Sequence, residues 1–353
     1  MTDVHQLSIM EKFVKPTTKN LAEAAGVSLA TVDRVLNSRP GVRKKNIDKV
    51  KQAIDEIGFV RDLFAANLAR NREYHFLFIL PLSGDHFLDE IHRNIEEINK
   101  VMAGERVVVR TIQIDETTPH KLVKLIHELD TDNLHGIAIM APETPPLRDA
   151  IHHLKDRGIH VLAFISNLPS SDCDNFVGID NMAAGRTAAK LLGSYLHPGV
   201  GRIIVIAETM QSRDSLERRL GFDSIINSKF EELSVLPTLE TYNDPTRTKK
   251  VVTNALKSHP DIRGIYILSS EARIIMNAIS KIPQVAKLTK IAHERTAYTQ
   301  KALEENELDA VITQNTGHLV RSVIRTLRAK SDNRDIVESQ EKIRIEILLK
   351  ENL

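Results

Sequence analysis

TTKNLAEAAGVSLATVDRVLN, residues 17–37, holds two short sets of apolar residues on either side of one glycine, Gly26. Apolar residues recur at helical spacing on both sides of it, as Leu21, Ala22 and Ala25 and then as Val32, Val35 and Leu36. A glycine permits the tight backbone bend between two helices, and Ser28 stands where a helix N-cap belongs, ahead of residues 29–36. The stretch therefore predicts a helix–turn–helix.

The second helix of such a pair enters the major groove of DNA. Ser28, Thr31 and Asn37 carry side chains that can hold phosphates, and Arg34 can contact guanine through two hydrogen bonds. The alternative is a helical hairpin within some larger core, which would need no DNA.

Two further segments follow. Residues 41–59 predict a third helix, with Ile47, Val50, Ile54 and Ile57 at helical spacing and Gly58 ending it. Residues 61–70, RDLFAANLAR, are too few to form a stable helix alone. An apolar side chain from such a segment can wedge between base pairs in the minor groove and bend the duplex.

LAEAAGVSLATVDRVLN, the helix after it and AANLA together resemble the N-terminal region of the lactose-repressor (LacI/GalR-type) family of bacterial transcription regulators. The resemblance implies that the last segment is a hinge helix that folds on the operator, with Leu68 as the wedge. It also implies that Leu29 and Ala30 are the main specificity positions. The DNA-binding candidates are Thr18, Ser28, Leu29, Ala30, Thr31, Arg34, Asn37 and Leu68.

Asp33 departs from the family pattern, because most relatives carry serine beside the base-reading arginine. A carboxylate there repels phosphates, or else accepts a hydrogen bond from a cytosine amino group. We therefore expect the family's mode of DNA binding without predicting an operator sequence.

Charge is distributed unevenly along the 353 residues. Residues 1–72 hold 13 Lys/Arg and 8 Asp/Glu, a net charge of +5, whereas the remainder holds 35 and 39, a net charge of −4. A basic head on an acidic body fits nucleic-acid binding by the head. Cys173 is the only cysteine, so no intrachain disulfide is possible. With no apolar run of about 20 residues and no signal-peptide core, we expect a cytoplasmic protein without a membrane span.

From residue 74 onward, short apolar runs alternate with amphipathic stretches. Strands are predicted at 75–80, 106–112, 135–140, 159–164, NFVGI, 202–207, LSVLPTL and 264–268, with helices between them that include 87–102 and 119–130. This alternation predicts an α/β fold with two doubly wound parallel-sheet lobes, divided near residues 166–174. We predict three parts: an all-α helix–turn–helix head at 1–60, a hinge helix and linker at 61–73, and a two-lobed effector and dimerisation domain at 74–353.

The two-lobed domain predicted at 74–353 also resembles the periplasmic-binding-protein-like core of the same family, in FVGIDNMAAGRTAAKLL, RRLGF, HERTAYTQKAL and LDAVITQNTGHLVRSVI. The resemblance implies that Arg218 reaches into a ligand cleft and that Asp180 and Gln314 face it. Arg218 could instead be a solvated helix residue. Asp180 and Gln314 could instead cap helices or pack at the chain crossovers.

Three more effector candidates come just after predicted strands: Phe87, Glu271 and Glu294. Ligands of doubly wound sheets bind beyond the carboxyl ends of the strands. A phenylalanine can stack on a sugar ring, and family members often use acidic residues there to accept bonds from sugar hydroxyls. Each of the three could equally be structural. The effector class left open is a sugar, a polyol or a sugar phosphate.

No motif for catalysis, a metal or a cofactor is visible, since GxSxG, the P-loop, GxGxxG and His/Cys metal spacings are all missing from the sequence. We therefore expect no cofactor, no metal and no enzymatic activity. The predicted function is a homodimeric regulator, expected to act as a repressor, that binds a pseudo-palindromic operator under control of a small sugar-like effector. The alternatives are a sugar-modifying enzyme and a sugar-binding transport component.

Overall fold

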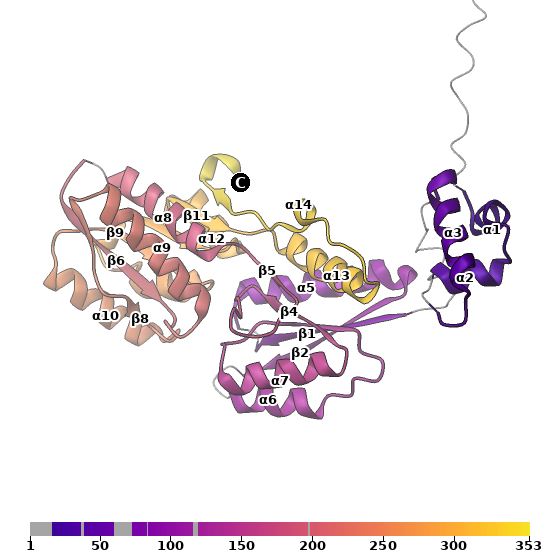
Figure 1. The fold of residues 1–353 in the computed structure, drawn as a ribbon. Helices are drawn as coiled ribbons and strands as arrows, with labels where there is room; N and C mark the ends of the chain where they lie inside the picture. Colours follow the sequence, from indigo (N-terminus) through magenta and orange to yellow (C-terminus); the bar gives the residue numbers. More distant parts are fainter. Residues whose placement is uncertain (1–15, 37–38, 60–72, 83, 116–118, 197) are drawn as a thin grey trace, which may run out of the picture. The chain divides into compact units, whose positions relative to one another are not determined.

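The computed structural model describes residues 16–36, 39–59, 73–82, 84–115, 119–196 and 198–353. The chain forms two separate compact units, residues 1–72 and 73–353 (Figure 1). Asn37 and Leu68 lie outside the described residues, so the roles predicted for them stay predictions.

The first unit contains three helices, α1 (Thr18–Ala25), α2 (Leu29–Leu36) and α3 (Lys44–Ile57). Gly26 ends α1 in the left-handed conformation with φ 60°, which a residue with a Cβ rarely adopts. The Ser28 hydroxyl accepts a bond from the Thr31 N–H at 3.2 Å, as an N-cap does. Leu21, Val32 and Val50, one from each helix, are fully buried together. The predicted helix–turn–helix and third helix are therefore confirmed.

The second unit has two lobes. Lobe 1 is a parallel sheet in the order β2-β1-β3-β4-β5. Its strands are β1 (Tyr74–Pro81), β2 (Val107–Ile114), β3 (Gly136–Ile139), β4 (His160–Phe164) and β5 (Asn175–Val177). Its helices are α5 (His86–Met102), α6 (Pro119–Glu128), α7 (Pro145–Asp156), α13 (Thr316–Ser331) and the short η1 (Ala103–Glu105). Alternate residues of β1 face two layers, α5 and α13 on one side and α6 and α7 on the other.

Lobe 2 is a sheet in the order β12-β11-β10-β9-β6-β7, with β8 also paired to β6. Its strands are β6 (Gly201–Ala207), β7 (Leu233–Val235), β8 (Leu239–Glu240), β9 (Ile262–Ile267), β10 (Thr289–His293), β11 (Ala310–Thr313) and the antiparallel β12 (Glu346–Leu348). Its helices are α8 (Asn181–Leu196), α9 (Arg213–Lys229), α10 (Pro245–Ser258), α11 (Ala272–Ile279) and α12 (Ala297–Glu304). Its short helices are η2 (Val285–Lys287) and η3 (Lys350–Asn352), whereas α14 (Glu338–Glu341) contacts α13 on lobe 1. Helices α8 and α9 cover one face of the sheet, and α10 to α12 cover the other.

The boundary predicted between the lobes, near residues 166–174, is wrong. The strand β5 pairs with β4, Leu162 opposite Asn175, and so completes the first sheet before the chain enters lobe 2. The chain also returns once, because α13 packs on lobe 1 after β11 has ended in lobe 2. Hydrophobic runs identify strands but do not state which sheet each strand joins.

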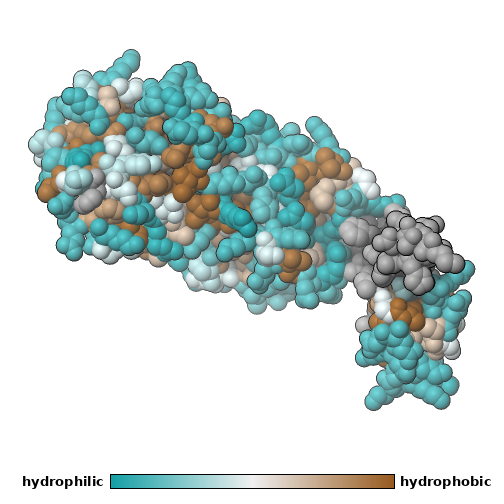
Figure 2. Space-filling model, turned by 90° about the horizontal axis from the view of Figure 1, so that it is seen from above, coloured by the Kyte–Doolittle hydropathy of each residue, from teal (hydrophilic) through white to brown (hydrophobic). Residues whose placement is uncertain are grey.

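The surface face drawn in Figure 2 is largely hydrophilic, with apolar patches interspersed on the larger unit. Among the described residues, no helix is both long and apolar enough to cross a membrane.

Candidate functional site

Helix α2 presents an exposed surface in the first unit. Ser28, Leu29, Ala30 and Arg34 are exposed, and Thr31 is half-buried. Leu29 leaves 49% of its surface open, whereas Val32 on the same helix is fully buried. Packing within the unit therefore does not account for this leucine, whereas contact with a partner surface would. Thr18, the first residue of α1, is exposed as well.

The unusual acidic residue of α2 has a cationic neighbour. Asp33 Oδ2 lies 3.3 Å from Arg39 Nη1, and both side chains are more than half exposed. An exposed pair of this kind contributes little stability, about 0–1 kcal/mol. Its consequence is electrostatic, because Arg39 offsets part of the negative charge that Asp33 places on the exposed face.

In lobe 2, Arg218 lies at the centre of a buried polar network. Only 2% of its surface is exposed, so the alternative interpretation as a solvated helix residue is wrong. Its Nη2 donates to Glu294 Oε1 at 3.1 Å and its Nη1 to the Leu268 carbonyl at 2.9 Å. Its Nε donates to Asn181 Oδ1 at 2.9 Å. A buried guanidinium requires such partners, since an uncompensated charge in the interior is costly.

Close contact between α8 and α9 positions this network. A Cβ on Gly221 would lie 2.1 Å from the Met182 carbonyl oxygen, and one on Gly185 would lie 2.0 Å from the Arg218 carbonyl oxygen. Only glycine at both places lets the two backbones approach so closely. The approach brings Asn181, at the start of α8, within hydrogen-bond reach of Arg218 on α9.

Glu294 follows strand β10 and adopts φ 63°, a left-handed conformation that a non-glycine residue rarely takes. It is 1% exposed and accepts bonds from Gln314 Nε2 at 3.1 Å and from the Thr313 hydroxyl at 3.3 Å. Burial raises the pKa of Glu294 to about 7, although the Arg218 charge and the Gln314 amide oppose that rise. The carboxylate is therefore held in place at an energetic cost, which is a feature of binding sites more than of cores.

Polar contacts join the two lobes beside this network. The Asp85 carboxylate, which caps α5 in lobe 1, accepts a bond from the Ser270 hydroxyl in lobe 2. The backbone N–H of His86 donates to Glu271 Oε2 at 3.2 Å. Glu271 is 2% exposed and caps α11. These contacts place the carboxyl-end loops of the two sheets against each other.

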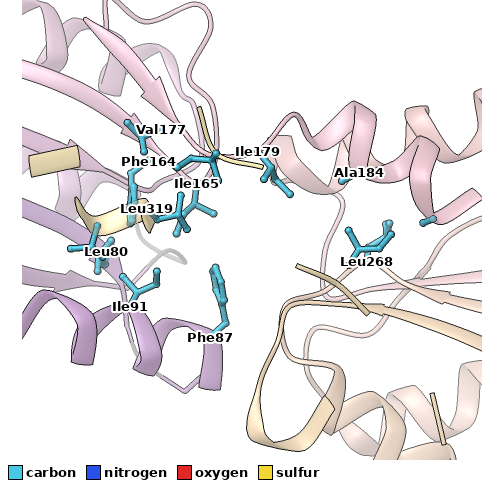
Figure 3. Packing of buried hydrophobic residues seen from close by; sticks show 14 of the residues in the cluster. Leu80, Phe87, Ile91, Phe164, Ile165, Val177, Ile179, Ala184, Leu268 and Leu319 are labelled. Carbon is cyan, nitrogen blue, oxygen red and sulfur yellow. The ribbon is translucent and has the colours of Figure 1, made fainter. Parts of the chain in front are cut away.

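Phe87 is the apolar contribution of lobe 1, since it is 2% exposed in the first turn of α5. Figure 3 shows Phe87 at the N-terminal end of α5 in lobe 1 and Leu268 on the facing side of lobe 2. The structure thus brings five predicted residues to the interlobe region: Phe87, Arg218, Glu271, Glu294 and Gln314.

Asp180 is the exception among the predicted effector residues. It is exposed, and its Oδ1 accepts a bond from the Ala183 N–H at 2.8 Å, so it caps α8. It also pairs with Arg186 at 3.6 Å and lines a surface hollow beside Leu216 and Leu220. The capping alternative is therefore what the structure supports, and the next residue, Asn181, supplies the contact to Arg218.

Sequence patterns missed three participants: Asp85, Asn181 and Ser270. Asp85 had a signal, because an aspartate two residues before the apolar Phe87 fits an N-cap. In the described part of the chain, no group of three or more His, Cys, Asp or Glu side chains could hold a metal ion.

Comparison with known proteins identifies both units. Residues 17–62 match the family model described as bacterial regulatory proteins, lacI family, and residues 76–335 match that of the periplasmic binding protein domain. The chain is 25% identical over 205 residues to the HTH-type transcriptional regulator DegA of Bacillus subtilis, covering 58% of this chain and 59% of DegA. It is 24% identical over 254 residues to the ribose operon repressor of Halalkalibacterium halodurans, covering 72% of this chain and 71% of that repressor.

Among solved structures, GanP, a glucose-galactose binding protein from Geobacillus stearothermophilus, superposes with a TM-score of 0.70. The superposition covers 80% of this chain and 99% of GanP at 15% identity, so it establishes the fold alone. A helix–turn–helix unit followed by this two-lobed binding fold defines the class of DNA-binding transcription regulators, and not a class of enzymes. Within that class, the chain belongs to the periplasmic binding protein domain family over residues 76–335 and carries a lacI-family regulatory unit at residues 17–62.

Proposed function

We propose that this protein is a cytoplasmic homodimer that represses transcription at a pseudo-palindromic operator and is controlled by a sugar-like effector bound between its lobes. The observation that supports the effector site is the buried Arg218–Glu294 pair. It lies at the carboxyl ends of the lobe 2 strands, beside the contacts with lobe 1. The ribose operon repressor and GanP, by their names, support repression and a sugar-like ligand.

Each effector residue has a role that its position suggests. Arg218, Glu294 and Gln314 form hydrogen bonds to ligand hydroxyls from lobe 2, and Glu271 does so from the lobe interface. Phe87 provides the apolar surface against which one face of a ring packs. Asp180 keeps its capping role and is not part of this proposed site.

Control of DNA binding follows from linkage. An effector that contacts both lobes binds one lobe arrangement better than the other and shifts the population toward it. The Asp85–Ser270 and His86–Glu271 contacts are the interlobe bonds that such a ligand would replace or reinforce. The lobe arrangement then determines the spacing of the two DNA-reading units of a dimer.

On DNA, Arg34 reads guanine, Leu29 and Ala30 contact base edges, and Thr18, Ser28, Thr31 and Asn37 hold phosphates. Leu68, from the segment that folds on the operator, opens the central base step. A marginal helix suits this role, because its folding can be coupled to binding.

A mobility-shift assay with genomic fragments tests the proposal. Arg34→Ala should lower the preference for operator over random DNA by about 1–3 kcal/mol. Lys51→Ala, which removes an exposed cation from α3, is the matched control and should leave that preference unchanged. If the wild type retards no fragment with sequence preference, or Arg34→Ala keeps full preference, the DNA-binding assignment is wrong.

The wedge is tested separately. Leu68→Ala should reduce operator affinity and DNA bending together, while non-specific binding, set mainly by phosphate charge, changes little. Circular-permutation gels measure the bend angle. A variant that bends and binds the operator as the wild type does would exclude Leu68 as a wedge.

A further inference from the structure

The interlobe region collects carboxylates. Asp85, Glu208, Glu271 and Glu294 each follow the end of a strand, namely β1, β6, β9 and β10. Their charges repel one another. The charge of Glu271 raises the pKa of Asp85, the charge of Asp85 raises that of Glu294, and the charges of Asp85 and Glu271 raise that of Glu208. Asp214, at the start of α9, adds to the negative field at Glu208.

Burial and neighbouring negative charges disfavour the ionised forms of Asp85 and Glu208. Burial raises the pKa of Asp85, against the bonds from Ser270 and the Phe87 N–H, and the Glu271 charge adds to the rise. Partial desolvation likewise raises the pKa of Glu208, with a hydrogen bond from Asn243 opposing it. A positive charge placed beside carboxylates that repel one another stabilises their ionised forms.

The arginines of the site are already engaged. Arg218 pairs with Glu294, and Arg273 lies 3.3 Å from Glu271. No arginine or lysine pairs with Asp85 or Glu208 among the ion pairs of the described residues. The site therefore carries an excess of negative charge at these two carboxylates.

A second and independent observation points to a ligand. Asn181 and Gln314 are 1% and 3% exposed, and each uses one amide atom on the Arg218–Glu294 pair. The orientation of each amide is determined by charge, because a guanidinium N–H must meet an oxygen and a carboxylate must meet an N–H. The remaining atoms, Asn181 Nδ2 and Gln314 Oε1, have no hydrogen-bond partner in the described structure.

A buried unpaired donor and a buried unpaired acceptor each destabilise the protein unless a hydrogen-bond partner satisfies them. A hydroxyl group does both, since it accepts from an N–H and donates to an oxygen. A phosphate ester does not fit the same region, because its two negative charges would face Asp85 and Glu208 with no unpaired cation beside them. A ligand ammonium would instead be attracted by the carboxylates of Asp85 and Glu208.

On the premise that the interlobe region is the effector site, we infer that the effector is a hydroxyl-rich compound that carries a positively charged amino group, and that phosphorylated sugars are rejected. Its hydroxyls bind Asn181 Nδ2 and Gln314 Oε1 at the Arg218 network. Its ammonium lies between Asp85 and Glu208, at the rim that the exposed Glu208 side chain forms. Charge-assisted bonds to those two carboxylates supply the selectivity.

Calorimetry on the full chain without DNA tests the inference. The probes are matched sets of hexoses and pentoses: the neutral sugar, its amino-deoxy analogue and its phosphate ester. We expect an amino compound to bind about tenfold or more tightly than its neutral parent, and its phosphate ester to give no heat. Glu208→Gln should remove most of that advantage. Because Glu208 is exposed, this variant should fold normally.

Glu231→Gln is the matched control, since it removes the same charge from an exposed position before β7, at the opposite end of the sheet, and should keep the advantage. A phosphate ester that binds as tightly as its parent sugar overturns the inference. So does an amino group that adds nothing, or the failure of every amino compound to bind. Operator binding is measured apart from these titrations, so failure of the inference and failure of the proposed regulator are distinguishable.

Discussion

Two carboxylates at opposite edges of the two lobes differ in how the fold treats them. Asp174 precedes β5 at the amino edge of the lobe 1 sheet, and Glu294 follows β10 at the carboxyl edge of the lobe 2 sheet. Burial alone would raise the pKa of Asp174, but His160, the Val161 N–H and Lys155 lower it to about 2. Burial raises the pKa of Glu294 to about 7 despite Arg218.

The difference separates an acid whose ionised form the fold favours from one whose ionised form it disfavours. Asp174 has Lys155 Nζ at 3.3 Å, His160 Nδ1 at 3.6 Å and the Val161 N–H at 2.8 Å, so its ionised form is favoured by the fold. Glu294 shares one arginine with Asn181 and the Leu268 carbonyl, in a strained backbone conformation. Strain and incomplete neutralisation at the carboxyl edge are what a ligand can relieve.

The largest effect should come from Arg218→Ala. Removing one partner of a buried ion pair leaves the Glu294 charge uncompensated, and the expected loss of effector-domain stability is about 3–5 kcal/mol. Effector binding should be lost as well. Denaturant unfolding followed by probes in each unit measures the loss of stability, and calorimetry measures effector binding. The head should keep its own unfolding transition because it is a separate unit.

Arg213→Ala is the control on the same helix. Arg213 pairs with Glu217 at 2.6 Å and its side chain is 47% exposed, so its loss should cost much less. If the two variants were equally destabilised and still bound effector, the distinction drawn for the Arg218 network would fail.

A smaller effect should appear with pH. The pKa of Glu294 is about 7 in the folded protein and 4.5 ordinarily, so the folded state holds more protons in between. The free energy of unfolding should therefore fall as pH rises from 4.5 to 7, by about 3 kcal/mol at most. Glu294→Gln should flatten this part of the pH profile of chemical denaturation, and an unchanged slope would show that another group titrates there.

The sequence indicated much of this comparison, and its gaps have physical causes. The three helices of the head could be predicted, because helix spacing, Ser28 and Gly26 act through neighbours in the chain, although α3 spans Lys44–Ile57 within the predicted 41–59. Resemblance indicates Arg218 and Gln314 as cleft candidates, and the position after a predicted strand indicates Glu294. Their mutual contacts span 76 and 20 residues, and local patterns do not report such distances.

Asp180, which caps α8, shows where a local pattern separates it from the inward-facing Asn181. Asn181 lies on the buried stripe of α8 that includes Gly185, Ala188 and Leu192, whereas Asp180 precedes the helix. Helical spacing thus favours Asn181 as the inward residue. The lobe boundary had no comparable signal, because the pairing of β5 with β4 is a tertiary choice.

The smallest effect should follow Asp174→Asn. The amide still accepts the Val161 N–H but loses the charge that Lys155 and His160 meet, and the expected loss is about 1–2 kcal/mol near neutral pH. Because the pKa of Asp174 is lowered from 3.8 to about 2, its stabilisation is complete above pH 3.8 and disappears as pH falls through about 2. The wild type and the variant should therefore converge in acid, as urea midpoints across that range would measure.

Asp172→Asn is the matched control for Asp174. Asp172 contacts the same Lys155 at 3.1 Å, but its side chain is 59% exposed, so its removal should change stability by less than about 0.5 kcal/mol. Neither variant should alter effector affinity, because both residues lie at the amino edge of the sheet, away from Arg218. A loss of effector binding in Asp174→Asn would mean that the two edges are coupled, and that a lowered pKa alone does not mark a purely structural acid in this fold.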